Sequence, residues 1–174
     1  MLNFDKIYLV RHGSYERYSQ ELSAAGIEQS ERAGQQLLSA GAKREVTVLS
    51  SDAQRALQTS TIIASILETT VMPSKRINVI GNEPGGVGSL DEMVEIALAE
   101  AGAKPEGESL IVVTHQPLLQ IAAFGAKVAN GQIVEYQPQT WNNPEFSERA
   151  QQYLLGRLGA AGLDLGSGPG PRTR

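Results

Sequence analysis

Short apolar runs and stretches of helical periodicity alternate along this chain. The runs Ile7–Val10, Val46–Leu49 and Leu110–Thr114 are mainly apolar, which is typical of strands buried on both faces of a parallel sheet. Weaker strands are predicted at Thr70–Met72, Ile77–Ile80 and, late in the chain at an edge, Gln132–Tyr136. The alternation predicts an α/β fold, a single-domain three-layer sandwich with a mostly parallel central sheet flanked by helices.

Capping residues and periodic apolar faces mark the helices. Ser23 is placed to cap a helix that Gly41 ends, and the Ser50–Asp52 side chains are placed to cap a helix that runs to Leu67. Ser89–Glu92 has the spacing of a capping box and opens a third helix through Ala101. Composition predicts a loop at Gly81–Gly88, before the third helix, and two further helices are predicted at Pro117–Phe124 and Pro144–Leu158.

The length and composition are those of one ordinary globular domain. The chain has 174 residues, and we predict one domain over residues 1–160, followed by a disordered tail over residues 161–174 that is rich in Gly and Pro. A net charge of -4 argues against a general nucleic-acid or membrane-surface binder. The absence of cysteine excludes disulfides and thiolate metal sites. No signal core or membrane-spanning run is present, so we expect a cytoplasmic protein.

Both histidines of the chain follow predicted strands. His12 lies within Arg11-His12-Gly13 after the first strand, and His115 follows the Leu110–Thr114 strand. Arg55 lies in the opening turns of the helix that follows the second strand. Ligands of open α/β sheets bind at the carboxyl ends of strands, guanidinium groups suit phosphate oxygens, and a neutral imidazole is a competent nucleophile. We expect Gly13 to let the backbone turn sharply and approach a ligand. Taken singly, each of these residues is commonly structural, but their joint placement predicts a phosphoryl-handling site.

Four blocks of residues carry a resemblance to a known family. They are Arg11-His12-Gly13, Leu22-Ser23-Ala24-Ala25-Gly26 with Gln29, Ser50-Ser51 through Arg55-Ala56-Leu57-Gln58-Thr59, and Val113-Thr114-His115-Gln116-Pro117. In this order the chain resembles the histidine phosphatase superfamily, which includes phosphoglycerate mutases and small phosphohistidine phosphatases. The resemblance implies a phosphoglycerate mutase-like fold and a phosphatase that needs no metal and no organic cofactor. It implies that His12 accepts the phosphoryl group in a pocket completed by Arg11, Arg55 and His115.

The chain also departs from the family pattern. Its first loop, Ser14–Glu21, lacks the asparagine that larger members place after the histidine. In addition, Gln20-Glu21 stand where many small members carry an arginine, for which Arg17 could substitute. Asp52 replaces a proline, a change that we expect to matter little. For the general acid, Glu83 is the tentative choice and Glu16 a weaker one. A phosphohistidine substrate needs no dedicated acid, because imidazole leaves more easily than an alkoxide. Between Arg55 and His115 there is also little room for the helical insert with which larger relatives cover their substrate.

Several functions therefore stay open. The leading hypothesis is a phosphatase acting on phosphohistidine of a partner protein. A second is a phosphomonoesterase acting on small phosphorylated metabolites, with Glu83 as its acid. A third is a catalytically weak phosphate-binding regulatory module. A two-histidine metal hydrolase is the least favoured, because neither histidine has a neighbouring ligand at metal-site spacing.

Overall fold

The structure is a computed structural model that describes residues 4, 6–42, 45–78, 90–102, 108–123 and 126–136. The predicted loop Gly81–Gly88, the predicted helix Pro144–Leu158 and the predicted tail 161–174 lie outside these residues. All of the described residues belong to one compact unit that spans Met1–Gln137. The predicted domain limit at residue 160 stays a prediction.

A five-stranded sheet lies at the centre of the described residues. Its strands are β1 (Lys6–Arg11), β2 (Val46–Ser51), β3 (Val71–Ser74), β4 (Ser109–Thr114) and β5 (Ile133–Tyr136). Their order is β3-β2-β4-β1-β5. The pairs β2–β3, β2–β4 and β1–β4 are parallel, and β5 pairs antiparallel with β1 at an edge. The predictions of a mostly parallel sheet and of a late edge strand are confirmed.

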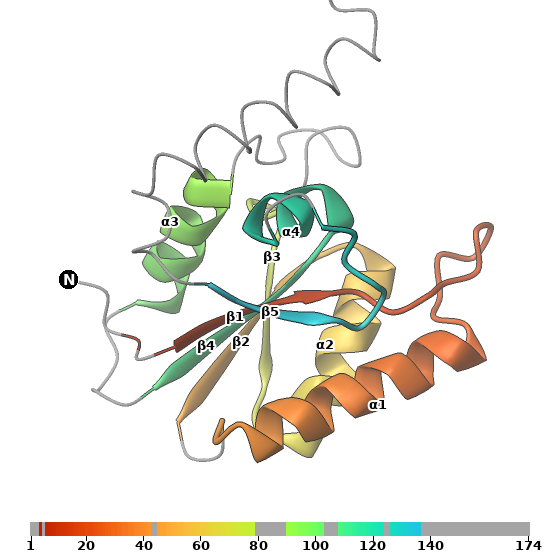
Figure 1. Cartoon of the computed structure of the whole chain (residues 1–174), viewed down its shortest axis with the longest axis horizontal. Coiled ribbons are helices and arrows are strands. Elements are labelled where there is room, and N and C mark those ends of the chain that lie inside the picture. The colour runs from red at the N-terminus through yellow and green to blue at the C-terminus, as the bar shows by residue number, and fades with distance from the viewer. Residues whose placement is uncertain are drawn as a thin grey trace, which may run out of the picture. The chain divides into compact units, whose positions relative to one another are not determined.

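Helices cover both faces of this sheet. They are α1 (Ala24–Ser39), α2 (Gln54–Ile66), α3 (Leu90–Ala101) and α4 (Gln116–Ala122). Figure 1 shows α1 and α2 on one face and α3 and α4 on the other. The three-layer α/β sandwich predicted from the alternation of strands and helices is therefore confirmed. None of the helices in the described ranges is long and apolar enough to cross a membrane.

Strand β4 is buried along its whole length, because it lies at the middle of the sheet. Side chains alternate between the two faces of a strand, and Ile111 and Val113 belong to a cluster that includes Leu37 of α1 and Ile63 of α2. Leu110 and Val112 are equally buried and point to the opposite face by the same alternation. Because helices cover both faces of the sheet, neither face of a central strand meets solvent. The central strands therefore do not alternate between apolar and polar residues.

Two details of the prediction were wrong. Helix α2 begins after Ala53, and no side chain of Ala53 caps it. The Ser50 hydroxyl donates to the Ser51 carbonyl, and the Ser51 hydroxyl contacts His115 and accepts from the Ala53 N–H, not from an N–H inside the helix. Ile77 and Asn78 form no strand, because the chain turns after β3, where the Asn78 N–H donates to the Lys75 carbonyl over 3.4 Å. The rest of the predicted strand, residues 79–80, lies outside the described residues.

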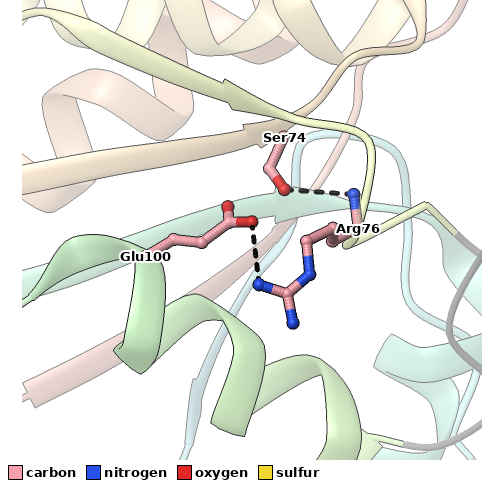
Figure 2. Close-up of polar contacts among 3 residues, drawn as sticks. All are labelled: Ser74, Arg76 and Glu100. Atoms are coloured by element: carbon pink, nitrogen blue, oxygen red, sulfur yellow. Dashed lines mark hydrogen bonds and ion pairs between the residues drawn. The ribbon is translucent and has the colours of Figure 1, made fainter.

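The turn after β3 also contacts α3. Arg76 Nη1 lies 3.6 Å from Glu100 Oε1, and the Arg76 N–H donates to Ser74 Oγ, as Figure 2 shows. The Arg76 side chain is 64% exposed, so this ion pair is of the kind that contributes at most about 1 kcal/mol. The contact therefore adds little to the packing that holds α3 on the sheet.

The start of α1 packs tightly against the segment that follows β1. A Cβ on Gly13 would lie 2.5 Å from the Gly26 carbonyl oxygen, and a Cβ on Gly26 would lie 1.9 Å from the Ser14 carbonyl oxygen. Both contacts are with backbone, which cannot swing away as a flexible side chain would. Gly13 is thus required by its contact with Gly26, rather than by the sharp turn that the sequence led us to expect.

We expect Gly26→Ala to destabilise the protein by about 1–3 kcal/mol, because overpacking a filled site forces the backbone apart. The displaced segment holds His12, so activity should fall with stability. Ala25→Ser is the matched control, because it adds one heavy atom at an exposed neighbour and should change stability by less than about 0.5 kcal/mol. Urea denaturation measures both, and equal midpoints for the two variants would contradict the packing argument.

Candidate active site

Parallel pairing brings the carboxyl ends of β1, β2 and β4 to one edge of the sheet. Arg11 is the register partner of Thr114, and the next residues along the two strands are His12 and His115. The two imidazole centroids lie 5.1 Å apart, and His12 and His115 are 5% and 2% exposed as whole residues. The sheet topology therefore places both histidines of the chain in one buried site.

Arg55, in the first turn of α2, bridges the two rings. Its Nε donates to His12 Nε2 over 3.3 Å, and its Nη2 lies 3.3 Å from His115 Nδ1. A guanidinium can only donate, so both of these ring nitrogens carry a lone pair. The structure thus brings together three of the predicted site residues, His12, Arg55 and His115.

The contacts on the far side of each ring agree with this assignment. His12 Nδ1 donates to the Gly13 carbonyl over 2.8 Å, which leaves Nε2 bare and directed at Arg55. His115 Nε2 donates to Ser51 Oγ over 2.9 Å, which leaves Nδ1 bare. His12 Nε2 is therefore in the form that a nucleophile requires.

Burial keeps both imidazoles neutral. Burial lowers the pKa of His12 to about 4 against a hydrogen bond to the Gly13 carbonyl that raises it, and the positive charges of Arg55 and Arg11 lower it further. Burial lowers the pKa of His115 to about 3, with additional lowering from His12, Arg55 and Arg11. At neutral pH both rings can accept hydrogen bonds from Arg55.

These pKa values predict a pH dependence of stability. Each ring binds a proton less readily in the folded chain than in the unfolded chain, where its pKa is about 6.5. Stability should therefore be complete above about pH 6.5 and fall as the pH drops toward 4, because the unfolded state takes up the protons. The expected loss is a few kcal/mol, since a tenfold change in proton affinity corresponds to about 1.4 kcal/mol.

Urea denaturation of the parent at pH 7 and pH 5 measures this loss. The double variant His12→Gln, His115→Gln serves as the control, because carboxylates contribute equally to both proteins. The parent should lose more stability than the control between these two pH values. An equal loss in both would contradict the burial of neutral rings.

Arg11 approaches the site from the end of β1. Its Nη1 donates to the Val128 carbonyl over 2.6 Å, while its buried Nε has no hydrogen-bond partner among the described residues. Burial lowers the pKa of Arg11, and Tyr15 partly offsets this lowering. The charge of Arg11 is felt by both histidines. Arg11 thus adds positive charge beside the histidine pair.

Three motif residues hold the segment around the nucleophile. The Gly13 N–H donates to Thr59 Oγ1 over 2.9 Å, the Ser14 N–H to Gln29 Oε1 over 2.8 Å, and the Leu22 N–H to Gln58 Oε1 over 2.6 Å. Ser23 caps α1 as predicted, accepting from the Gly26 N–H over 3.2 Å. Thr59, Gln29 and Gln58 are therefore anchors of the first loop.

The first loop contributes two site residues that the sequence did not identify. The Tyr15 ring lies edge-on to His12 at 5.4 Å, and Arg55 Cζ lies 4.8 Å from its centroid, a cation–π contact. Gln20 Oε1 accepts from Arg55 Nη1 over 2.7 Å, although Gln20 has a positive φ of 62°. The only signal available in the sequence was that Gln20 stands where small members of the family carry an arginine.

The remaining predicted residues are not brought to the rings. Glu83 lies outside the described residues, so its role as the acid stays a prediction. Glu16 and Arg17 are exposed, and it is Gln20 that contacts Arg55 where we considered Arg17. Among the described residues, no group of three or more His, Asp or Glu side chains is placed to hold a metal ion.

A polar cleft of about 450 Å³ opens beside Arg55. Its lining residues are Gln20, Asp52, Ala53, Gln54, Arg55, Lys75 and Asn78. Arg55 lines this cleft and also contacts both imidazoles, so the cleft lies next to the histidine pair. The arrangement can bind an anion between neutral rings and guanidinium groups.

Comparison with known proteins agrees with this geometry. A family profile described as histidine phosphatase superfamily (branch 1) matches residues 7–80. No curated protein matches the chain in sequence. Three of the four sequence blocks that carry the family resemblance lie within these matched residues, and the profile confirms the resemblance there. The block at Val113–Pro117 lies beyond them.

Three solved structures illustrate the fold similarity. A mycobacterial glucosyl-3-phosphoglycerate phosphatase in complex with VO3 has a TM-score of 0.56 and 17% identity, covering 75% of this chain and 90% of that one. A candidate phosphohistidine phosphatase, SixA, from Agrobacterium tumefaciens has a TM-score of 0.55 and 15% identity, covering 77% and 92%. A protein named mycobacterial hydrolase 1 has a TM-score of 0.55 and 16% identity, covering 75% and 90%. These neighbours show that the chain shares their fold.

Proposed function

Because the chain matches the histidine phosphatase superfamily in sequence and in fold, we propose that it is a phosphatase that works through a phosphohistidine intermediate on His12. The observation that carries the proposal is the state of His12. Its Nδ1–H is held by the Gly13 carbonyl, and its bare Nε2 lies 3.3 Å from the Arg55 Nε donor. A nucleophile and a cationic donor therefore share the position that a phosphoryl group would enter.

The reaction follows from these groups in two displacements. In the first, His12 Nε2 forms a bond to phosphorus while the bond to the leaving group breaks, and the leaving group takes up a proton. In the second, water attacks phosphorus, the bond to Nε2 breaks, and phosphate is released. Arg11, Arg55 and His115 would donate to the equatorial oxygens in both steps, where the charge develops.

We propose phosphohistidine on a partner protein as the favoured substrate. Within the described ranges, Tyr15, Gln20 and Ser51 make ring or hydrogen-bond contacts to the two imidazoles and the Arg55 guanidinium. None of these three side chains is a carboxylic acid. A P–N bond needs less help from an acid than a phosphate ester, because imidazole is the better leaving group. The SixA neighbour, itself a candidate phosphohistidine phosphatase, has the same fold.

A phosphomonoesterase is the second candidate function. It is favoured by the glucosyl-3-phosphoglycerate phosphatase neighbour, whose name describes an ester substrate. In this alternative Glu83 would protonate the alkoxide leaving group. A catalytically weak phosphate-binding module is the third candidate, and the altered first loop is its support.

A substrate panel separates the three candidates. The panel compares a phosphohistidine peptide with the same peptide carrying phosphoserine, and with an aryl phosphate and a sugar phosphate, each in the presence of a chelator. Preferred turnover of the phosphohistidine peptide supports the proposal, whereas preferred turnover of an ester that Glu83→Gln abolishes supports the phosphomonoesterase. Binding of phosphate without turnover of any substrate would support the regulatory module. Activity lost on chelation would favour a metal hydrolase instead.

A further inference from the structure

A chain of three polar side chains leads from His115 to the cleft beside Arg55. His115 Nε2 bonds to Ser51 Oγ over 2.9 Å, and Ser51 Oγ bonds to Asn78 Oδ1. Asn78 Nδ2 then donates to Asp52 Oδ1 over 2.6 Å. Ser51 is fully buried and Asn78 is 3% exposed, while Asp52 lines the cleft. The chain thus joins a buried imidazole to a carboxylate at the cleft wall.

Each hydrogen bond between these side chains has one direction that its donor and acceptor allow. The Asp52 carboxylate accepts, so it holds the Nδ2 side of the Asn78 amide. The Oδ1 side of the amide therefore faces Ser51 and takes the single hydrogen of that hydroxyl. Ser51 Oγ is then left to accept, and it does so from the Ala53 N–H over 3.3 Å and from His115. The donors and acceptors of this hydrogen-bond network are therefore mutually consistent.

We propose that Asp52 is a positioning residue that fixes the proton of His115 on Nε2 by orienting the Asn78 amide. Without an acceptor at position 52, the amide can turn over and present Nδ2 to Ser51. The Ser51 hydrogen would then point to His115 Nε2, and the ring proton would move to Nδ1. That nitrogen faces Arg55 Nη2, itself a donor, at 3.3 Å.

The consequence for catalysis rests on the proposed phosphatase function. When an anionic phosphoryl group enters, His115 is expected to donate to it from Nδ1 and must then keep its second proton on Nε2. Ser51 can accept that second proton only while its own hydrogen is directed at Asn78. Asp52 would therefore favour the doubly protonated ring that phosphate binding requires, acting beside the charges of Arg11 and Arg55.

Nitrogen-15 NMR of the ligand-free protein tests the proposal, because the bare and the protonated nitrogens of a neutral imidazole have widely different shifts. The parent should show His115 protonated on Nε2. Asp52→Ala should move part of the population to the Nδ1–H form. The fraction that moves to the Nδ1–H form should be larger in an Arg55→Ala background, because the Arg55 guanidinium no longer donates to Nδ1 and so no longer disfavours a proton there. Asn78→Leu, which removes the acceptor of the Ser51 hydrogen, should have the same effect and serves if Asp52→Ala does not fold.

A swapped pair is the matched control. In the double variant Asp52→Asn, Asn78→Asp, the new carboxylate still accepts from Ser51, and the new amide can donate to its other oxygen. This variant should keep the proton on Nε2, which a role in packing alone would not predict. Unchanged His115 shifts in Asp52→Ala, in both the parent and the Arg55→Ala backgrounds, would overturn the proposal.

Kinetics give the second readout. Orienting partners of functional histidines contribute about ten- to a hundredfold at metal sites, so we expect Asp52→Ala to lower kcat/KM at least about tenfold. The swapped pair should recover most of this loss. The NMR experiment does not depend on turnover. A parent protein without phosphatase activity would therefore refute the proposed function, while the nitrogen-15 chemical shifts of His115 would still decide the role of Asp52.

Discussion

Replacing His12 with alanine should abolish hydrolysis of the phosphorylated substrate. The unprotonated Nε2 of this ring is the protein nucleophile of the proposed mechanism, and removing such a group costs about 10⁴-fold or more in rate. Rapid acid-free quenching during turnover should trap phosphate on the parent as an acid-labile, base-stable adduct. The His12→Ala protein should form no such adduct.

The buried position of His12 requires a stability control. The ring is 5% exposed and contacts the Gly13 carbonyl and the Tyr15 ring, so alanine leaves a cavity. His12→Gln fills more of the space and should be equally inactive. A variant that folds as the parent does and still turns over the favoured substrate would end the assignment of His12 as the nucleophile.

Arg55→Ala should have the second largest effect, lowering kcat by about 10²- to 10³-fold. Removing one donor to a developing anion commonly costs this much, and Arg55 also aligns both rings through Nε and Nη2. Arg55→Lys should recover only part of the rate, because an ammonium group cannot reproduce the planar fork that meets His12, His115 and Gln20.

Arg76→Ala is the matched control for the loss of a positive charge. Arg76 is 64% exposed, and its ion pair with Glu100 on α3 is the contact drawn in Figure 2. Its removal should change neither kcat nor stability by a measurable amount. Steady-state kinetics and thermal unfolding of the two variants make the comparison. An Arg55→Ala protein with near-normal kcat would show that the phosphoryl group binds elsewhere.

The layer structure could be predicted because burial on both faces leaves a simple pattern. Strands β1, β2 and β4 are apolar runs between covering helices, and each was predicted to within a few residues. The start of α2 could not be predicted in the same way. The Ser51 hydroxyl bonds to His115 and Asn78, two residues distant in sequence, so local capping preference did not decide where the helix begins.

The site shows the same division. His12, Arg55 and His115 follow strands or open a helix, and parallel pairing alone brings such positions together. Tyr15, Gln20 and Asn78 reach the site from loops, where no periodic pattern indicates which way a side chain points. Asp52 was expected to matter little as a replacement for proline, whereas it lies at the end of the His115 hydrogen-bond chain.

The anchoring of the first loop has a consequence for how specificity could diverge. The main-chain N–H groups at the two ends of this loop donate hydrogen bonds to three side chains. Gly13 donates to Thr59, Ser14 to Gln29 and Leu22 to Gln58. Main-chain contacts are indifferent to the side chains carried between them. Substitutions at positions 16–19, between Tyr15 and Gln20, can therefore change what meets an incoming molecule while the reactive imidazole keeps its place, so recognition can evolve separately from chemistry.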